Sequence, residues 1–103
     1  MNLKALQTLV AIHDAQSFVE AARRLGLTQS AVSMQIKALE RDLDVVLFDR
    51  TMRPPAMTAA AVAIIRPARE ILALAAGIRE TVQDRETLAG RLSLSAISTA
   101  TIG

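Results

Sequence analysis

The sequence has no cysteine, tryptophan or tyrosine, and Phe18 and Phe48 are its two phenylalanines. Without cysteine, disulfides, thiol catalysis and cysteine-ligated zinc are excluded, and a reducing compartment is permitted. With so few aromatic side chains, a core must be built from leucine, isoleucine, valine, alanine and methionine, which favours helices packed on helices. At 103 residues the chain is long enough for one small domain and a projecting element.

The excess of positive over negative charge is also small. The chain has 12 lysines and arginines and 10 acidic residues, for a net charge of +2. Any nucleic-acid contact must therefore depend on where the basic side chains lie and not on bulk charge. The longest apolar run, residues 59–65, is shorter than the roughly 18 residues of a membrane helix. His13 and Asp14 interrupt the apolar N-terminal stretch, so it does not resemble a signal peptide. The sequence predicts a soluble, cytoplasmic protein without membrane contact.

Catalytic groups are few. The chain has one histidine and no glycine-rich phosphate loop. His13 lies beside Asp14 in a helical stretch, where a structural or surface role accounts for it. Asp42 and Asp44 follow the end of a predicted helix and are interpreted as solvated loop charges. The sequence therefore predicts no enzyme, no cofactor and no metal site.

Apolar periodicity predicts three short helices, over residues 3–13, 18–25 and 28–43. A Ser-x-x-Glu capping box opens the second. Gly26, which accepts a positive φ, is a natural end for it, and Thr28 is a suitable N-cap for the third. Two helices joined by so short a turn form a helix-turn-helix pattern.

The third of these helices has two different faces. Four apolar residues on one side are predicted to face the core: Val32, Ile36, Leu39 and Leu43. The opposite side is polar at its start and basic towards its end, with Ser30, Ser33, Met34, Lys37 and Arg41, and Gln29 lies in the first turn, where it can reach past the helix end. Serine and glutamine suit base edges and phosphate oxygens, and lysine suits phosphate, although a merely solvated face has the same composition.

Residues 46–57 leave the helical period. The stretch "VLF" favours a strand, and Pro54 and Pro55 block both a helix and ladder donation. A short β-hairpin or extended loop is predicted, from which Arg50 and Arg53 project. Arginine can enter a minor groove or hold phosphate, so this segment could be a DNA-binding wing, although an Arg-Pro loop can also be simply solvated.

A long helix is predicted from Thr58, its N-cap, to about residue 88. Apolar residues recur along it at spacings of four and three: Ile64, Ala68, Ile71, Ala75, Ile78 and Val82. At about 1.5 Å per residue such a helix reaches roughly 46 Å, more than the small domain can cover. The stripe is therefore expected to pack against a second copy, the alternative being a helix folded back on its own domain. Pro67 predicts either a kink or a first segment that ends near Arg66.

The last residues, "GRLSLSAISTATIG", alternate as a half-buried strand does, with no sheet to join. They suggest the start of a further domain that has been cut away. The predicted organisation is a winged helix-turn-helix over residues 1–57, a linker helix over 58–89 and this truncated domain over 90–103.

Taken together, these stretches resemble the N-terminal part of LysR-type transcriptional regulators, which are bacterial DNA-binding proteins. The matching segments are "SFVEAARRLGLTQSAVSMQIKALERDLDVVLFDR", the region of Arg53 and "MTAAA", and the tail resembles the first strand of the family's ligand-binding domain. The resemblance implies a mainly α fold with a winged helix-turn-helix and a long dimerisation helix. It also implies binding to interrupted dyad-symmetric promoter sites, tetramers built from linker-helix dimers, and a small-molecule effector in the missing C-terminal domain.

By position, the resemblance assigns major-groove contacts to Gln29, Ser30 and Ser33, and phosphate contacts to Thr28 and Lys37. These residues, with Met34 and the two wing arginines, are the predicted DNA-binding set.

The resemblance also assigns roles to the wing arginines. Arg50 would brace the hairpin or meet phosphate, and Arg53 would reach the minor groove. Three positions depart from the family's pattern: Ser30 is often proline, Met34 is often arginine, and Ala61 is commonly glycine. Without a bidentate arginine, roughly 1–3 kcal/mol of base discrimination is forgone. Specificity is then expected to depend on thymine methyl contacts or DNA shape.

The sequence thus predicts a sequence-specific transcriptional regulator that binds double-stranded DNA as a homodimer, with helix 28–43 in the major groove and wing 46–57 at the minor groove. The alternative is a helical dimerisation and protein-interaction module without DNA binding, which the modest net charge favours slightly. A common surface for Lys37, Arg50 and Arg53 of both protomers distinguishes the two, because DNA binding predicts it.

Overall fold

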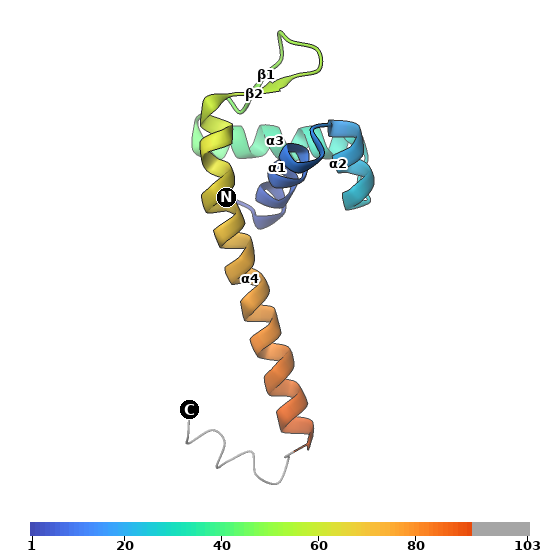
Figure 1. Ribbon diagram of the computed structural model, residues 1–103, viewed down its shortest axis with the longest axis vertical. Coiled ribbons are helices and arrows are strands. Elements are labelled where there is room, and N and C mark those ends of the chain that lie inside the picture. The colour runs from blue at the N-terminus through green and yellow to red at the C-terminus, as the bar shows by residue number, and fades with distance from the viewer. Residues whose placement is uncertain (92–103) are drawn as a thin grey trace. The chain divides into compact units, whose positions relative to one another are not determined.

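The fold is known from a computed structural model, which describes residues 1–91 (Figure 1). The tail in which a strand is predicted, residues 92–103, lies outside the described residues. The elements in chain order are α1 (Leu3–Ala15), α2 (Phe18–Leu25), α3 (Gln29–Leu43), β1 (Phe48–Asp49), β2 (Ala56–Met57) and α4 (Ala59–Arg91). The predicted mainly α architecture, with a small hairpin and a long last helix, is confirmed. One compact unit comprises residues 1–72, and a second begins at Ala73.

Local capping explains where the helices of the first unit begin and end. The Ser17 side chain accepts a hydrogen bond from the Glu20 N–H at 3.1 Å, which opens α2 as the capping box predicts. Gly26 ends α2 with φ +67°, a conformation that favours glycine. Thr28 Oγ1 then accepts from the Ala31 N–H at 3.1 Å and opens α3. The predicted bounds of α2 are confirmed, whereas α1 continues two residues past the predicted end, to Ala15.

A single apolar core lies among α1, α2, α3, the hairpin and the start of α4. Its buried members are Ala5, Leu6, Leu9, Ile12, Ala21, Ala22, Val32, Ile36, Leu39, Leu47, Phe48, Ala61, Ile65 and Ala68. The two phenylalanines meet edge to face there, with ring centroids 4.9 Å apart. One predicted core residue is wrong: Leu43 is 37% exposed, because it lies in the last turn of α3, after the final buried contact of that helix at Leu39.

The hairpin is a two-stranded antiparallel ribbon. Phe48 pairs with Met57 and Asp49 with Ala56, and the loop between the strands projects from the helices (Figure 1). The strand is shorter than "VLF" predicts, because the Leu47 N–H donates to the Glu40 side chain at 2.8 Å before β1 begins. The hairpin alternative is therefore the one the structure adopts for residues 46–57.

α4 is a continuous helix that passes through Pro67. Thr58 Oγ1 accepts from the Ala61 N–H at 3.2 Å and opens the helix, as predicted. A helix end near Arg66 is excluded by the structure. Proline has no N–H to donate within the helix, so the ladder lacks one bond there, and packing of the helix start against the core compensates for it.

Part of the predicted dimerisation stripe packs on the chain's own core. Ala68 is 1% exposed because α1 and the rest of the core cover it, and Ile64 and Ile71 are partly buried against the same core. The expectation that Ala68 faces a second copy is therefore wrong. The alternative of a helix folded back on its own domain holds for this first part of α4.

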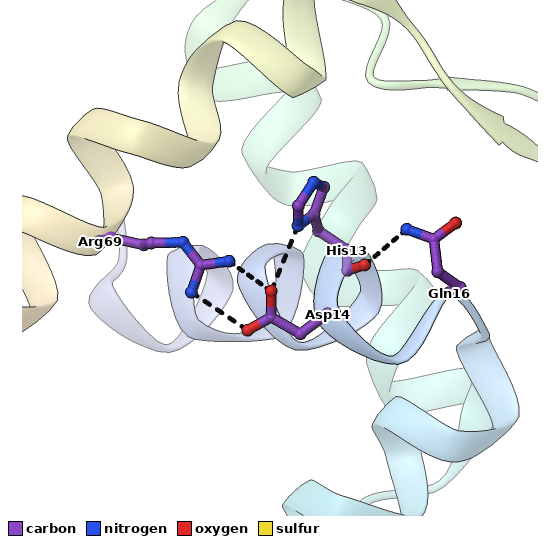
Figure 2. A network of polar contacts seen from close by, with 4 residues as sticks. All are labelled: His13, Asp14, Gln16 and Arg69. Atoms are coloured by element: carbon purple, nitrogen blue, oxygen red, sulfur yellow. Dashed lines mark hydrogen bonds and ion pairs between the residues drawn. The ribbon is translucent and has the colours of Figure 1, made fainter.

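An ion pair also ties this part of α4 to α1 (Figure 2). The Arg69 guanidinium donates two hydrogen bonds to the Asp14 carboxylate, one of them 3.1 Å long from Nη1 to Oδ2. The hydrogen bond from Arg69 lowers the pKa of Asp14, and His13 Nδ1 lies 3.2 Å from the same carboxylate. His13 therefore belongs to a surface network, which is the structural role expected for it. Across the described residues, no helix has both the length and the apolar character to cross a membrane.

Candidate nucleic-acid interface

The predicted DNA-binding residues lie on α3, at its N-cap and in the hairpin loop. Seven of them are exposed, namely Thr28, Gln29, Ser30, Met34, Lys37, Arg50 and Arg53, and Ser33 is half-buried. The exposed face of α3 therefore carries the polar and basic side chains that the sequence places there, while Val32, Ile36 and Leu39 hold the opposite side in the core.

One groove joins the helix to the hairpin. It has a volume of about 350 Å³ and is lined by Gln29 and Ser33 of α3, by Arg50 and Pro54 of the hairpin, and by the N-terminal end of α2. The reading face of the predicted recognition helix and the base of the predicted wing thus share a continuous surface. This proximity of two elements distant in sequence is what a winged DNA-binding site requires.

The N-cap threonine can serve two roles at once. Its Oγ1 accepts the capping hydrogen bond from Ala31, while a hydroxyl keeps a proton that it can donate. Thr28 is exposed, so this proton can reach a phosphate oxygen placed at the start of α3.

Arginines of α2 lie outside this groove and are partly neutralised. Arg23 Nη2 is 2.5 Å and Arg24 Nε 3.0 Å from the same Glu20 oxygen. Hydrogen bonds from Arg23 and then Arg24 lower the pKa of Glu20 to about 2, so it is fully ionised at neutral pH. One carboxylate thus offsets part of the positive charge of this pair.

By contrast, no carboxylate in the described part of the chain forms an ion pair with Lys37, Arg41 or Arg53. Lys37 and Arg41 belong to the exposed face of α3, and Arg53 belongs to the hairpin loop. Positive charge that is available to an anion is therefore found on the exposed face of α3 and in the hairpin loop, and also at exposed Lys4 of α1. The small net charge of the chain hides this local arrangement.

Arg50 is the exception in the wing. Its Nη2 lies 3.9 Å from Glu40 Oε1, which braces the hairpin against α3 and leaves the Arg50 side chain 41% exposed. Sequence reasoning assigned no role to Glu40. The position of Glu40, three residues after Lys37, does not predict this contact, because Arg50 comes near Glu40 only where the chain reverses direction after α3.

The second unit carries an apolar stripe of its own. Ile78 and Val82 of the predicted seam are exposed, and Ala75 beside them is half-buried. Sequence reasoning missed Leu74, which is 70% exposed and lies four residues before Ile78. The signal was present, since Leu74, Ile78 and Val82 follow an i, i+4, i+8 spacing that puts them on one side of the helix.

Helix-turn-helix, hairpin and basic reading face together define a winged helix-turn-helix protein. The family model described as "Bacterial regulatory helix-turn-helix protein, lysR family" matches residues 3–62. The chain belongs to this LysR family.

Two relatives illustrate the extent of the match. An uncharacterised HTH-type transcriptional regulator of Azotobacter vinelandii is 40% identical over 96 residues, covering 92% of this chain and 67% of that protein. The HTH-type transcriptional regulator TcbR of Pseudomonas sp. (strain P51) is 36% identical over 103 residues, covering all of this chain and 34% of TcbR. The chain thus spans about a third of TcbR, whose remaining length has no counterpart here.

Solved structures of the family have the same fold. The DNA-binding domain of CbnR in complex with DNA superposes with a TM-score of 0.74 at 36% identity, covering 82% of this chain and 97% of that one. The DNA-binding domain of BenM bound to a benA site gives a TM-score of 0.73 at 30% identity, covering 82% of this chain and 94% of that one.

Proposed function

We propose that this chain is the DNA-binding part of a transcriptional regulator that recognises specific sequences in double-stranded DNA. The observation that carries the proposal is the shared groove, in which Gln29 and Ser33 of α3 lie beside Arg50 of the wing. Lys37 and Arg53, which form no ion pair within residues 1–84, belong to the same two elements. The related DNA-binding domains of CbnR and BenM have been solved in complex with DNA.

In this proposal α3 enters the major groove. Gln29, Ser30 and Ser33 reach base edges there, and the Met34 side chain supplies an apolar contact for thymine methyl groups. Thr28 and Lys37 hold phosphates on either side of the reading face.

The wing has a separate role. Arg53 lies in the hairpin loop and enters the minor groove, where arginine responds to groove width. Arg50 stays at the base of the hairpin and meets the phosphate backbone.

Selection of binding sites from a random duplex library, with the winners titrated against salt, tests this function. A dyad-symmetric motif with a steep loss of affinity at rising salt is expected, because each neutralised phosphate contributes about −0.9 to the log–log slope. Absence of binding even at low salt would favour the protein-interaction module instead.

Substitutions on α3 separate phosphate contacts from base contacts. Lys37→Ala is expected to weaken all DNA sequences about equally and to make the salt slope shallower by about 0.9, since one phosphate contact is lost. Ser33→Ala is expected to change which bases are selected. Fluorescence anisotropy on a panel of duplexes measures both effects.

Lys4→Ala is the matched control, because it removes the same charge from the exposed start of α1. Equal effects of Lys37→Ala and Ser33→Ala on every duplex would contradict the two assigned roles.

We further propose that the chain forms a homodimer through the second part of α4. The support is the exposed apolar stripe of Leu74, Ile78 and Val82, which needs a partner surface to be removed from water. Ala75 at its side is small and permits close approach of a second helix. In the full-length protein, tetramer formation and a small-molecule effector would depend on a further domain.

Ile78→Asp is expected to convert the dimer to a monomer, because it would bury an unpaired carboxylate at the helix contact. Sedimentation analysis over a range of protein concentrations measures the change. Ala76→Asp serves as the control, because Ala76 is exposed and lies about 160° around the helix from Ile78. A dimer that survives Ile78→Asp would show that the stripe is not the interface.

A further inference from the structure

Glu40 is an acid placed beside a surface that is proposed to meet phosphates. It lies on α3, one turn after Lys37, and its side chain is only 18% exposed. A carboxylate there repels DNA unless another charge compensates for it. Its position therefore needs an explanation, and its contacts supply one.

Both carboxylate oxygens of Glu40 contact the base of the hairpin. Oε2 accepts a hydrogen bond from the Leu47 N–H at 2.8 Å, and Oε1 lies 3.9 Å from Arg50 Nη2. Leu47 is fully buried and comes directly before β1. Glu40 is thus hydrogen-bonded to the backbone that enters the wing and lies at ion-pair distance from the arginine that follows its first strand.

Thr58 holds the same backbone from the other side. Its N–H donates to the Leu47 carbonyl at 3.0 Å, and its hydroxyl donates to the Val46 carbonyl at 2.7 Å. The base of the wing is therefore fixed to α3 by Glu40 and to the start of α4 by Thr58. Of these contacts, only that of Glu40 reaches a charged side chain on the proposed DNA surface.

We propose that Glu40 is a positioning residue. It makes phosphate binding by Arg50 depend on how well the DNA site fits α3. Glu40 restrains the guanidinium beside α3, so Arg50 meets a phosphate at the place where α3 is seated in the major groove. A restrained arginine loses less side-chain entropy on binding there, and it is less available to phosphates in other arrangements. This inference rests on the proposed function.

The test is the ratio of affinity for the selected site to affinity for unrelated duplex DNA. Glu40→Gln keeps an oxygen that accepts from the Leu47 N–H but removes the negative charge that restrains Arg50. The ratio is expected to fall about five- to tenfold, the size of coupling found within one charged network. Affinity for unrelated DNA is expected to rise, with a salt slope steeper by up to about 0.9 as Arg50 engages phosphate freely.

A double-mutant cycle shows whether Glu40 acts through Arg50. In the Arg50→Gln background, Glu40→Gln is expected to leave the affinity ratio unchanged. Asp42→Asn is the control. Asp42 is not a loop charge after the helix, as the sequence suggests, but an exposed residue of α3 whose carboxylate lies 3.6 Å from the N-terminal amine. Removing its charge should leave the ratio unchanged. Thermal unfolding of each variant shows whether folding is affected.

The outcomes separate this inference from the proposed function. An unchanged ratio in Glu40→Gln, an equal fall in both backgrounds, or the same fall in Asp42→Asn would overturn the role of Glu40. Arg50→Gln without effect on any duplex would overturn it as well, while site selection by the wild-type chain would leave the proposed function standing. Wild-type protein that selects no site would overturn both.

Discussion

Phe48→Ala is expected to lower the free energy of unfolding by about 3–5 kcal/mol, the usual cost of deleting a buried aromatic ring. Phe48 is 2% exposed, and its ring meets Phe18 of α2 edge to face. A small domain has about 5–15 kcal/mol of stability in total, so the loss would leave little. Urea unfolding followed by circular dichroism measures it.

The neighbouring Val46 provides the control. It is 63% exposed, so Val46→Ala should change the free energy of unfolding by less than about 0.5 kcal/mol. Phe48→Leu should recover part of the loss, because it refills some of the cavity. If Phe48→Ala and Val46→Ala behaved alike, the hairpin could not be anchored in the core as described.

Met34→Arg is expected to produce the largest change in DNA recognition. Met34 is 70% exposed on α3, so an arginine there disturbs no core contact. A bidentate arginine is worth roughly 1–3 kcal/mol of discrimination for guanine, or about five- to 150-fold. We expect selected sites to gain a guanine in each half-site and affinity for them to rise, as repeated site selection would show.

Added charge alone must be separated from base recognition. Gln7→Arg adds the same charge at an exposed position of α1 and should raise affinity for all duplexes without a new base preference. Identical selections by the two variants would mean that position 34 does not reach the bases.

Several elements could be predicted because their causes lie close together in the chain. The bounds of α2 follow from a serine that caps its start and a glycine that takes φ +67° at its end. The N-cap of α3 at Thr28 and that of α4 at Thr58 are likewise bonds that span three residues. The exposed face of α3 follows from helical periodicity, which places Lys37 opposite buried Ile36 and Leu39.

Long-range packing accounts for the predictions that were wrong. The seam residue Ala68 has the correct spacing for a dimer stripe, yet it is covered by the chain's own core because α1 lies beside α4. Leu43 fits the apolar face of α3 but lies past the last core contact. Residue spacing identifies the apolar side of a helix. It does not identify which element packs against that side or how far along the helix the packing extends.

The sequence by itself determined the helix-turn-helix, the presence of a wing and the polar reading face, because capping, turn geometry and periodicity act over a few residues. Only the tertiary structure decided that Glu40 holds Leu47 and Arg50, that Arg69 pairs with Asp14, and that the first part of α4 belongs to the core. These contacts join residues whose separation in the chain gives no local signal, so they exist only once the chain has closed on itself.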